Sequence, residues 1–229
     1  MKNKELELVT RYAPYLMFDE KEPFLVNAIG YTIFTETRKS DSFRRSVRIE
    51  KEKVDFAIEY AVCWDYDIQH LYELEHVWVY VDYEGKVCGC EASYHGKYIN
   101  QMLPGADIVR DETHVCLYSQ PGKHALLPER RLIYLYPDWK RACGELAGAD
   151  GFAYPEYLFD VPIPVTDEQQ EMVRSYIREH YRFVPTMEFV QRQYPDCFFR
   201  PWSVLREEIP LRMKAELEKI KIWAEKAKV

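Results

Sequence analysis

One stretch of the chain, from Trp64 to Asp82, concentrates the side chains that could do chemistry. It reads WDYDIQHLYELEHVWVYVD, so a dense group of ionisable residues leads into a strongly apolar strand. The ionisable residues ahead of the apolar part are Asp65, Asp67, His70, Glu73, Glu75 and His76. Charges at the edge of a core are costly unless they pair, hydrogen-bond or bind a cation. The stretch therefore needs partners for its charges.

Five of these residues predict a divalent-cation site: Asp65, Asp67, His70, Glu73 and Glu75. An oxygen-rich set with one imidazole suits Mg²⁺, Ca²⁺ or Mn²⁺ better than structural Zn²⁺, which prefers sulfur and several histidines. A cation would also offset the repulsion between carboxylates that otherwise raises a pKa. The alternative is a set of loop-end charges that face water. Strand alternation favours the site, because Glu75 shares a face with three valines and should point inward.

A second set of candidates comprises His76, His95 and His124, each beside the end of an expected strand. Three histidines could bind zinc or act as acid and base. For His76, which falls on the opposite strand face from Glu75, a hydrogen bond to a backbone carbonyl is the favoured role. His95 and His124 stand in expected loops, where functional groups are frequent. They are the two candidate catalytic residues, whereas Cys116 inside a strand is expected to be inert.

One strand and the hairpin that follows it must position these groups. Residues 54–67 alternate cleanly between apolar and mixed faces, which predicts a strand. Residues 73–95 predict a hairpin whose turn, YEGK, contains Gly85 as the residue able to take positive φ. Because an antiparallel partner retraces the path of the first strand, the hairpin should bring His95 to the acidic end.

The remaining pattern predicts a mainly β, α+β protein: an antiparallel β-sandwich with C-terminal helices. Strands are expected at 30–37 and 114–120, and irregular structure at 143–165. Thr166 and Gln169 match a capping box at the start of a helix over 166–180. A last helix is expected over 201–228, kinked or split at Pro210. We expect one domain, 1–229, made of a sandwich core at 11–165 and a helical appendage at 166–229.

Charge and composition exclude several classes of function. The net charge of −7 argues against binding of nucleic acid, and the basic segment Arg38–Arg48 is expected to be a solvated loop. The first residues are too charged for a signal peptide, and no apolar run has membrane-spanning length. Six cysteines are expected to be reduced thiols, with Cys88 and Cys90 on one face of a strand. These features predict a cytoplasmic protein.

Three motifs in order carry a family resemblance. The runs EHVWVYVD, ASYHGKY and VCLYSQPGKHAL, with the opening RYAPYLMFDEKEPFLV, resemble the vacuolar protein sorting-associated family, member sixty-two. More distantly, the chain resembles the necrosis-inducing, cytolysin-like proteins, whose signature is Gly-His-Arg-His-Asp-Trp-Glu. The likeness covers roughly residues 11 to 130. For the sorting-associated family it implies a fold more than a biochemical role.

The necrosis-inducing signature can be laid on this chain residue by residue. Its glutamate falls on Glu75, its aspartate on Glu73 and its first histidine on His70, and its upstream aspartate falls on Asp65 or Asp67. In that family these positions bind a divalent cation near the site that recognises the sugar headgroup of a lipid. The second signature histidine is Tyr72 here and the tryptophan is Leu74. These departures leave the cation ligands in place but do not support a toxin activity.

The sequence thus supports three hypotheses. The leading one is a binding protein whose cation presents open positions to a small polar ligand, such as a carbohydrate or a phosphorylated or lipid headgroup. The second is a metal-dependent hydrolase in which the cation activates water and His95 or His124 moves the proton. The third is a structural module with a hydrated acidic end, whose last helix is a surface for a homodimer or another partner.

Overall fold

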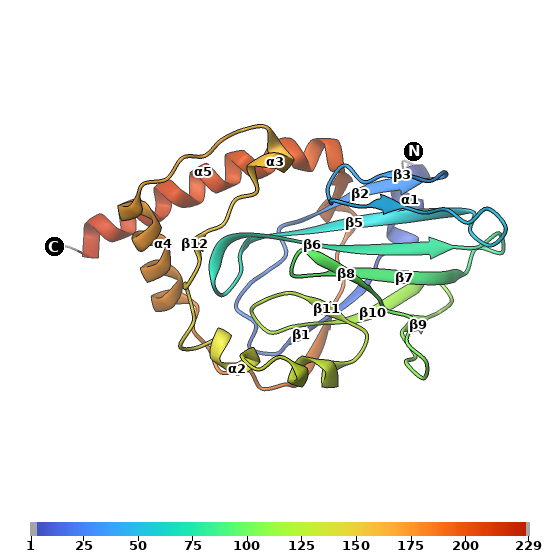
Figure 1. Cartoon of the computed structure of the whole chain (residues 1–229), viewed down its shortest axis with the longest axis horizontal. Helices are drawn as coiled ribbons and strands as arrows, with labels where there is room; N and C mark the ends of the chain where they lie inside the picture. Colours follow the sequence, from blue (N-terminus) through green and yellow to red (C-terminus); the bar gives the residue numbers. More distant parts are fainter. Residues whose placement is uncertain (1–3, 228–229) are drawn as a thin grey trace.

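The larger of the two main sheets holds most of the candidate site. The computed structural model describes residues 4–227 (Figure 1). The sheet has seven strands in the order β14-β2-β5-β6-β7-β8, and β12 pairs with the start of β6. Their bounds are β2 Ala28–Phe34, β5 Phe56–Tyr66, β6 His70–Val81, β7 Val87–Tyr94, β8 Lys97–Asn100, β12 Gly151–Phe152 and β14 Phe199–Pro201. The β6–β7 hairpin is confirmed, and Gly85 in its turn has φ of 79°.

The second sheet has five strands in the order β11-β10-β1-β13, with β9 beside β10. Its strands are β1 Tyr15–Asp19, β9 Val109–Arg110, β10 His114–Ser119, β11 Leu126–Leu127 and β13 Phe189–Arg192. Side chains from both sheets form one core, in which Phe18 of β1 meets Trp64 of β5 edge to face with ring centroids 6.3 Å apart. The predicted mainly β sandwich is therefore confirmed.

The outer face of the larger sheet is covered as well. The short hairpin of β3 (Arg38–Lys39) and β4 (Ser46–Val47) folds over it and encloses a smaller apolar cluster around Trp78. His76 lies under this cover with 1% of its surface exposed. Its Nε2 is 3.0 Å from the side-chain hydroxyl of Ser42. Burial lowers the pKa of His76 to about 3, which keeps it neutral.

Most of the helices lie toward one end of the sandwich, whereas the helix nearest the N-terminus lies at the opposite end (Figure 1). Their bounds are α1 Lys4–Arg11, η1 Arg130–Leu135, α2 Trp139–Ala142, α3 Glu156–Phe159, α4 Asp167–His180, η2 Asp196–Phe198 and α5 Trp202–Ala227. The capping box of Thr166 and Gln169 at the start of α4 is confirmed. The last helix, α5, runs on through Pro210 and is not split there. Within residues 4–227, no helix combines the length and apolar composition that crossing a membrane requires.

Several features differ from the sequence expectation because they depend on distant segments. The pairs β1–β10, β2–β14 and β6–β12 are parallel, so the sheets are mixed. The segment 166–229 contains α4 and α5 and also contributes β13 and β14 to the two sheets; its description as an appendage remains a prediction. Cys88 and Cys90 do not share a face, because the β6–β7 register shifts beside them; Cys88 is exposed and Cys90 is buried.

Candidate cation site

The turn between β5 and β6 builds the core of the site. Asp67 begins the turn, where its backbone N–H donates to the carbonyl of His70 at 2.9 Å and its carboxylate accepts from the N–H of Gln69. Tyr72 has φ of 81° and interrupts the strand alternation. His70 and Glu73 would lie on opposite faces of a regular strand. The break at Tyr72 is the reason that both side chains reach the same side.

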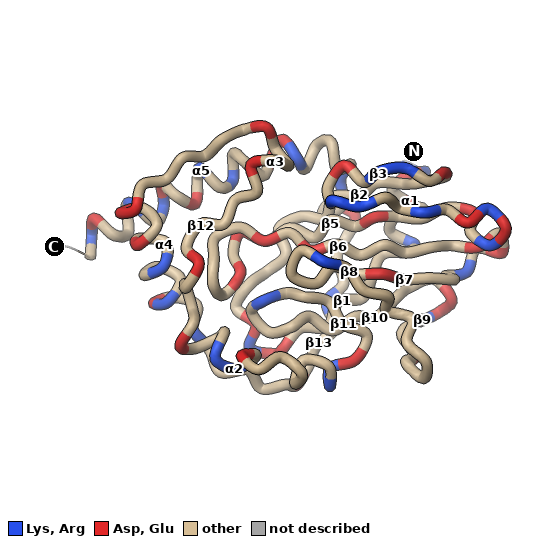
Figure 2. The backbone as a smooth tube through the Cα atoms, in the orientation of Figure 1, with Lys and Arg blue, Asp and Glu red and all other residues tan. Residues whose placement is uncertain are grey.

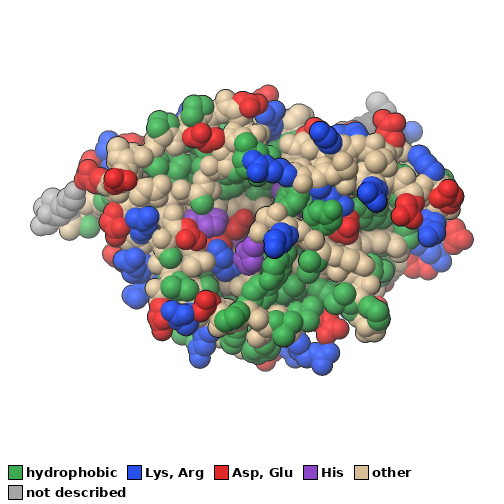
Figure 3. Space-filling view, in the orientation of Figure 1, with side chains coloured by type: hydrophobic (Ala, Val, Ile, Leu, Met, Phe, Trp, Pro, Cys, Tyr) green, Lys and Arg blue, Asp and Glu red, His purple; other side chains and the backbone are tan. Residues whose placement is uncertain are grey.

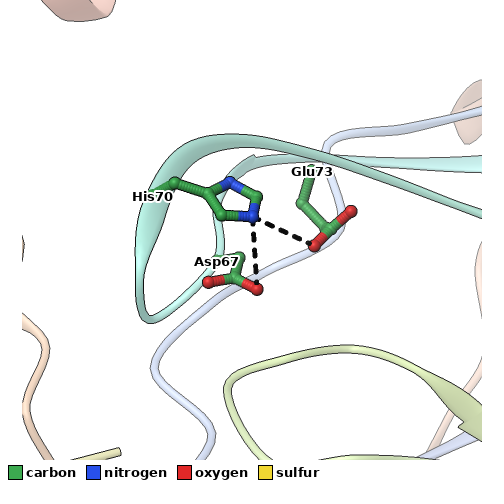
Figure 4. A group of neighbouring side chains, drawn as sticks. All are labelled: Asp67, His70 and Glu73. Atoms are coloured by element: carbon green, nitrogen blue, oxygen red, sulfur yellow. Dashed lines mark ion pairs between the residues drawn. The ribbon is translucent and has the colours of Figure 1, made fainter. Parts of the chain in front are cut away.

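Asp67, His70 and Glu73 offer one ligand atom each, and these atoms all lie within 4.8 Å of one another. Nε2 of His70 is 3.6 Å from Oδ2 of Asp67 and 3.9 Å from Oε2 of Glu73 (Figure 4). Both distances are too long for hydrogen bonds. The two carboxylates and the imidazole therefore surround a common point without bonding to each other.

In the tautomer that His70 adopts, the lone pair of Nε2 faces the carboxylates of Asp67 and Glu73. Nδ1 is 2.6 Å from the backbone oxygen of Tyr72, and only a protonated nitrogen can donate there. Burial lowers the pKa of His70, so the ring is neutral near pH 7 and Nε2 carries the lone pair. Metal-binding histidines characteristically have their other ring nitrogen fixed by such a hydrogen bond. The arrangement is the one that a cation ligand needs.

Lys123 is a member of the cluster that sequence reasoning missed. Its Nζ lies 2.6 Å from Oδ2 of the fully buried Asp67. The lysine stands in the turn between β10 and β11, where Gly122 and His124 both have positive φ, 69° and 58°. In the sequence, the only available signal was its place between Gly122 and His124 in a loop already singled out. With Asp67, Glu73 and Glu75 ionised, one ammonium against three carboxylates leaves two negative charges uncompensated.

The protonation of the acids reflects this imbalance. Burial, and then the charge of Glu75, raises the pKa of Glu73 well above its ordinary value. Burial raises the pKa of Glu75 to about 8, although the Ser93 hydroxyl donates a hydrogen bond to its carboxylate. Burial would also raise the pKa of Asp67, whereas His70 and Lys123 lower it to about 2. Without a cation, protons on Glu73 and Glu75 therefore reduce the negative charge of the cluster.

The cluster opens into a cavity of about 320 Å³. Figure 3 shows histidine and acidic side chains gathered in a hollow near the centre of this face. The cavity is lined by the charged and polar groups His70, Glu73, Glu75, His95 and Lys123 and by apolar groups such as Leu74 and Leu158. Between its pairing with β12 and its pairing with β7, the edge of β6 has no strand beside it among residues 4–227. A ligand of modest size has access to the cluster there.

The predicted residues separate into those that reach the cavity and those that do not. His70, Glu73 and Glu75 line it, and so do His76 and His95, the latter with Nε2 3.2 Å from Oε1 of Gln120. Asp67 is fully buried beside His70 and does not line the cavity itself.

Two predicted residues lie elsewhere. Asp65 forms a two-point ion pair with Arg212 of α5, at 2.9 and 2.7 Å. His124 is fully buried and stacks on Trp64 with ring centroids 4.3 Å apart. Asp65 and His124 therefore do not contribute to this cavity, because the tertiary partners Arg212 and Trp64 hold their side chains away from it.

Comparison with known proteins adds little to this geometry. No protein-family model and no curated protein matches the chain. Among solved structures, the chain is similar to a crystal structure of a mutant of NLPPya, a necrosis-inducing, cytolysin-like protein. The likeness has 18% sequence identity and a TM-score of 0.34, and it covers 55% of this chain and 72% of the other. These comparisons do not show that the chain belongs to either of the two families that its sequence resembles.

Proposed function

We propose that the protein binds a divalent cation through Asp67, His70 and Glu73, and that the cation presents open coordination positions to a polar ligand. The observation that carries the proposal is the lone pair on Nε2 of His70, which faces two carboxylates at non-bonding distances. Glu75 completes the ligand set from the same cavity. A divalent cation supplies the two positive charges that the cluster lacks with its acids ionised.

The ligand set indicates which cation and which ligand fit. Three carboxylates and one imidazole, without sulfur, favour Mg²⁺, Ca²⁺ or Mn²⁺ over Zn²⁺. A hydroxyl-rich carbohydrate or a phosphorylated headgroup, free or carried by a lipid, offers oxygen atoms to such a cation. The six free thiols fit a reducing compartment, so we assign the protein to the cytoplasm. A homodimer that forms through α5 remains a prediction, which a measurement of the molar mass in solution tests.

A metal-dependent hydrolase is the second candidate, and one observation favours it. His95 lines the same cavity as the cation ligands and could move a proton to or from a cation-bound water. A screen of phosphoester, ester and glycoside substrates with each cation separates the two functions. Turnover that disappears in His95→Ala, with cation affinity unchanged, identifies a hydrolase. No turnover with any substrate, together with cation binding, identifies a binding protein.

The cation site is tested by calorimetric titration with Mg²⁺, Ca²⁺, Mn²⁺ and Zn²⁺. We expect one cation to bind per chain and Glu73→Gln to weaken its affinity by at least about 100-fold, since even indirect ligand supports are worth 10- to 100-fold. Glu84→Gln, which removes an exposed carboxylate from the β6–β7 turn, is the matched control and should bind as the wild type does. Absence of binding heat with all four cations would reject both the binding protein and the hydrolase.

Stability should depend on pH in a cation-dependent manner. The pKa of Glu75 is about 8 in the folded protein, above its ordinary value of 4.5, so the folded state binds more protons between these values. Stability without cation should therefore fall as pH rises from about 5 to 8, with a slope of up to about 1.4 kcal/mol per pH unit for this group. Urea unfolding at several pH values measures the slope.

Two controls accompany the urea series. Glu75→Gln should flatten the slope, because the titrating group is gone. Saturating cation should remove the fall, because it displaces the protons and its binding strengthens as pH rises. A slope that is the same in the wild type and in Glu75→Gln would show that Glu75 does not hold a proton near neutral pH.

A further inference from the structure

A second cavity, of about 800 Å³, shares no lining residue with the cation cavity. It is formed by the end of the β3–β4 hairpin and the loop after it, together with outward-facing residues of β6, β7 and β8. Its volume is within the range of sites that bind small organic molecules. The polar lining includes Ser46, Tyr80 and Asn100 and the carboxylates of Glu50 and Glu91.

Three cationic side chains border this cavity: Arg45, Arg48 and Lys53. Arg45 and Arg48 belong to the basic segment around β3 and β4 (Figure 2). Arg48 is exposed and makes no ion pair or hydrogen bond with any residue of the part described. Lys53 is exposed and has Glu50 as a loose partner, with Nζ and Oε2 3.8 Å apart. Both cations are therefore available to an anion from solution.

Arg45 is held rigidly between these residues and the sheet. Its side chain is only 5% exposed, and its Nη2 donates to Oε2 of Glu91 at 2.6 Å. The guanidinium carbon lies 3.7 Å from the ring centroid of Tyr98 and 4.3 Å from that of Trp78. Its Nη1 is buried and has no acceptor among residues 4–227. This nitrogen is too enclosed for an anion in the cavity to reach it, so Arg45 acts on the cavity through its charge.

We propose that this cavity is a second ligand site, specific for a small organic polyanion that carries phosphate or carboxylate groups. Arg48 and Lys53 bind the charged groups at the rim, and the fixed guanidinium of Arg45 provides positive potential at the base. The inference does not depend on the cation site. It also revises the reading of Arg38–Arg48 as a solvated loop, because this segment packs over the sheet and encloses a cavity.

Two exposed thiols allow a direct test in the intact protein. Cys88 lines the cavity, whereas Cys197 is exposed elsewhere, beside β14. Alkylation by neutral iodoacetamide is followed for each cysteine by mass spectrometry, with pyrophosphate or citrate as the probe and chloride at equal ionic strength as reference. A probe at about ten times its Kd should slow alkylation of Cys88 about tenfold and leave Cys197 unchanged. Protection by pyrophosphate alone assigns a phosphate ligand, and protection by citrate alone a carboxylate ligand.

Charge-neutral variants separate a site from a general effect of salt. The double variant Arg48→Gln, Lys53→Gln changes exposed side chains, so it should fold and lose the protection. Protection is expressed relative to the rate of each variant without probe, because loss of two cations near Cys88 by itself slows its alkylation. The control Lys140→Gln, Lys214→Gln removes two exposed cations elsewhere and should keep the protection. Unchanged alkylation of Cys88 at millimolar concentrations of both probes, or equal protection of Cys88 and Cys197, would overturn the proposal.

Discussion

Replacement of Lys123 by methionine should destabilise the cation-free protein by about 3–5 kcal/mol, because it leaves the buried carboxylate of Asp67 without its ammonium partner. The same variant should regain most of this loss when a divalent cation is added, since a ligand at about 1,000 times its Kd contributes about 4 kcal/mol. Its cation affinity should exceed that of the wild type by about tenfold or more, because a competing positive charge has been removed. Urea unfolding at pH 8 with and without cation measures both effects.

The rescue by cation distinguishes two explanations of the acidic cluster. If Lys123 alone neutralises Asp67 in a purely structural ion pair, the variant loses stability and no cation restores it. If the cluster is a cation site, stability returns with the preferred cation. Lys86→Met is the matched control, because Lys86 pairs with Glu112 on the surface and its loss should leave stability nearly unchanged.

Gly148→Ala should destabilise the protein by about 3–5 kcal/mol, the second large effect. Gly148 has φ of 74°, and a Cβ atom there would stand 2.3 Å from the backbone oxygen of Arg174 in α4. Positive φ and overpacking each contribute roughly 1–3 kcal/mol to the loss of stability. The clash involves backbone atoms on both sides, so rotation of a side chain cannot relieve it. The N–H of Gly148 also donates to the carbonyl of Ile68, so the displaced loop would disturb the turn that carries Asp67. Chemical denaturation and cation titration measure the two consequences.

Variants at two other glycines distinguish the effect of backbone strain from that of steric clash. Gly144 lies in the same loop and has no positive φ, and a Cβ atom added there would meet no described atom within 4 Å, so Gly144→Ala should be nearly neutral. Gly105 has φ of 84° but open space, and Gly105→Ala should lose only about 1 kcal/mol. A loss in Gly148→Ala no larger than in Gly105→Ala would mean that α4 moves aside without penalty.

The parts of the fold that could be predicted from the sequence depend on residues close in the chain. Alternation identified β5 and the β6–β7 hairpin, and the hairpin geometry brought His95 into the cavity that contains Glu75. The capping box located the start of α4 because it is formed within four residues. Local steric and hydrogen-bond preferences are sufficient to determine such features.

The remaining features depend on contacts between distant segments, which periodicity cannot show. Lys123 reaches Asp67 only because the turn after β10 packs against the turn before β6. Asp65 is drawn to Arg212, which lies 147 residues away, and His124 is held in the core by Trp64. Three of the five predicted cation ligands form the tight group, and Glu75 lines the same cavity. The exception, Asp65, is the residue for which a helix late in the chain supplies a better partner.

The pairing of β13 with β1 and of β14 with β2 has a consequence for the order of events during synthesis. Strand β1 lies between β10 and β13, and strand β2 lies between β5 and β14. One edge of each N-terminal strand therefore stays unpaired until residues 189–201 are made. Open strand edges are templates for association between chains. The nascent protein therefore exposes unpaired strand edges through most of its translation. The two sheets can be completed only after the C-terminal segment has emerged from the ribosome.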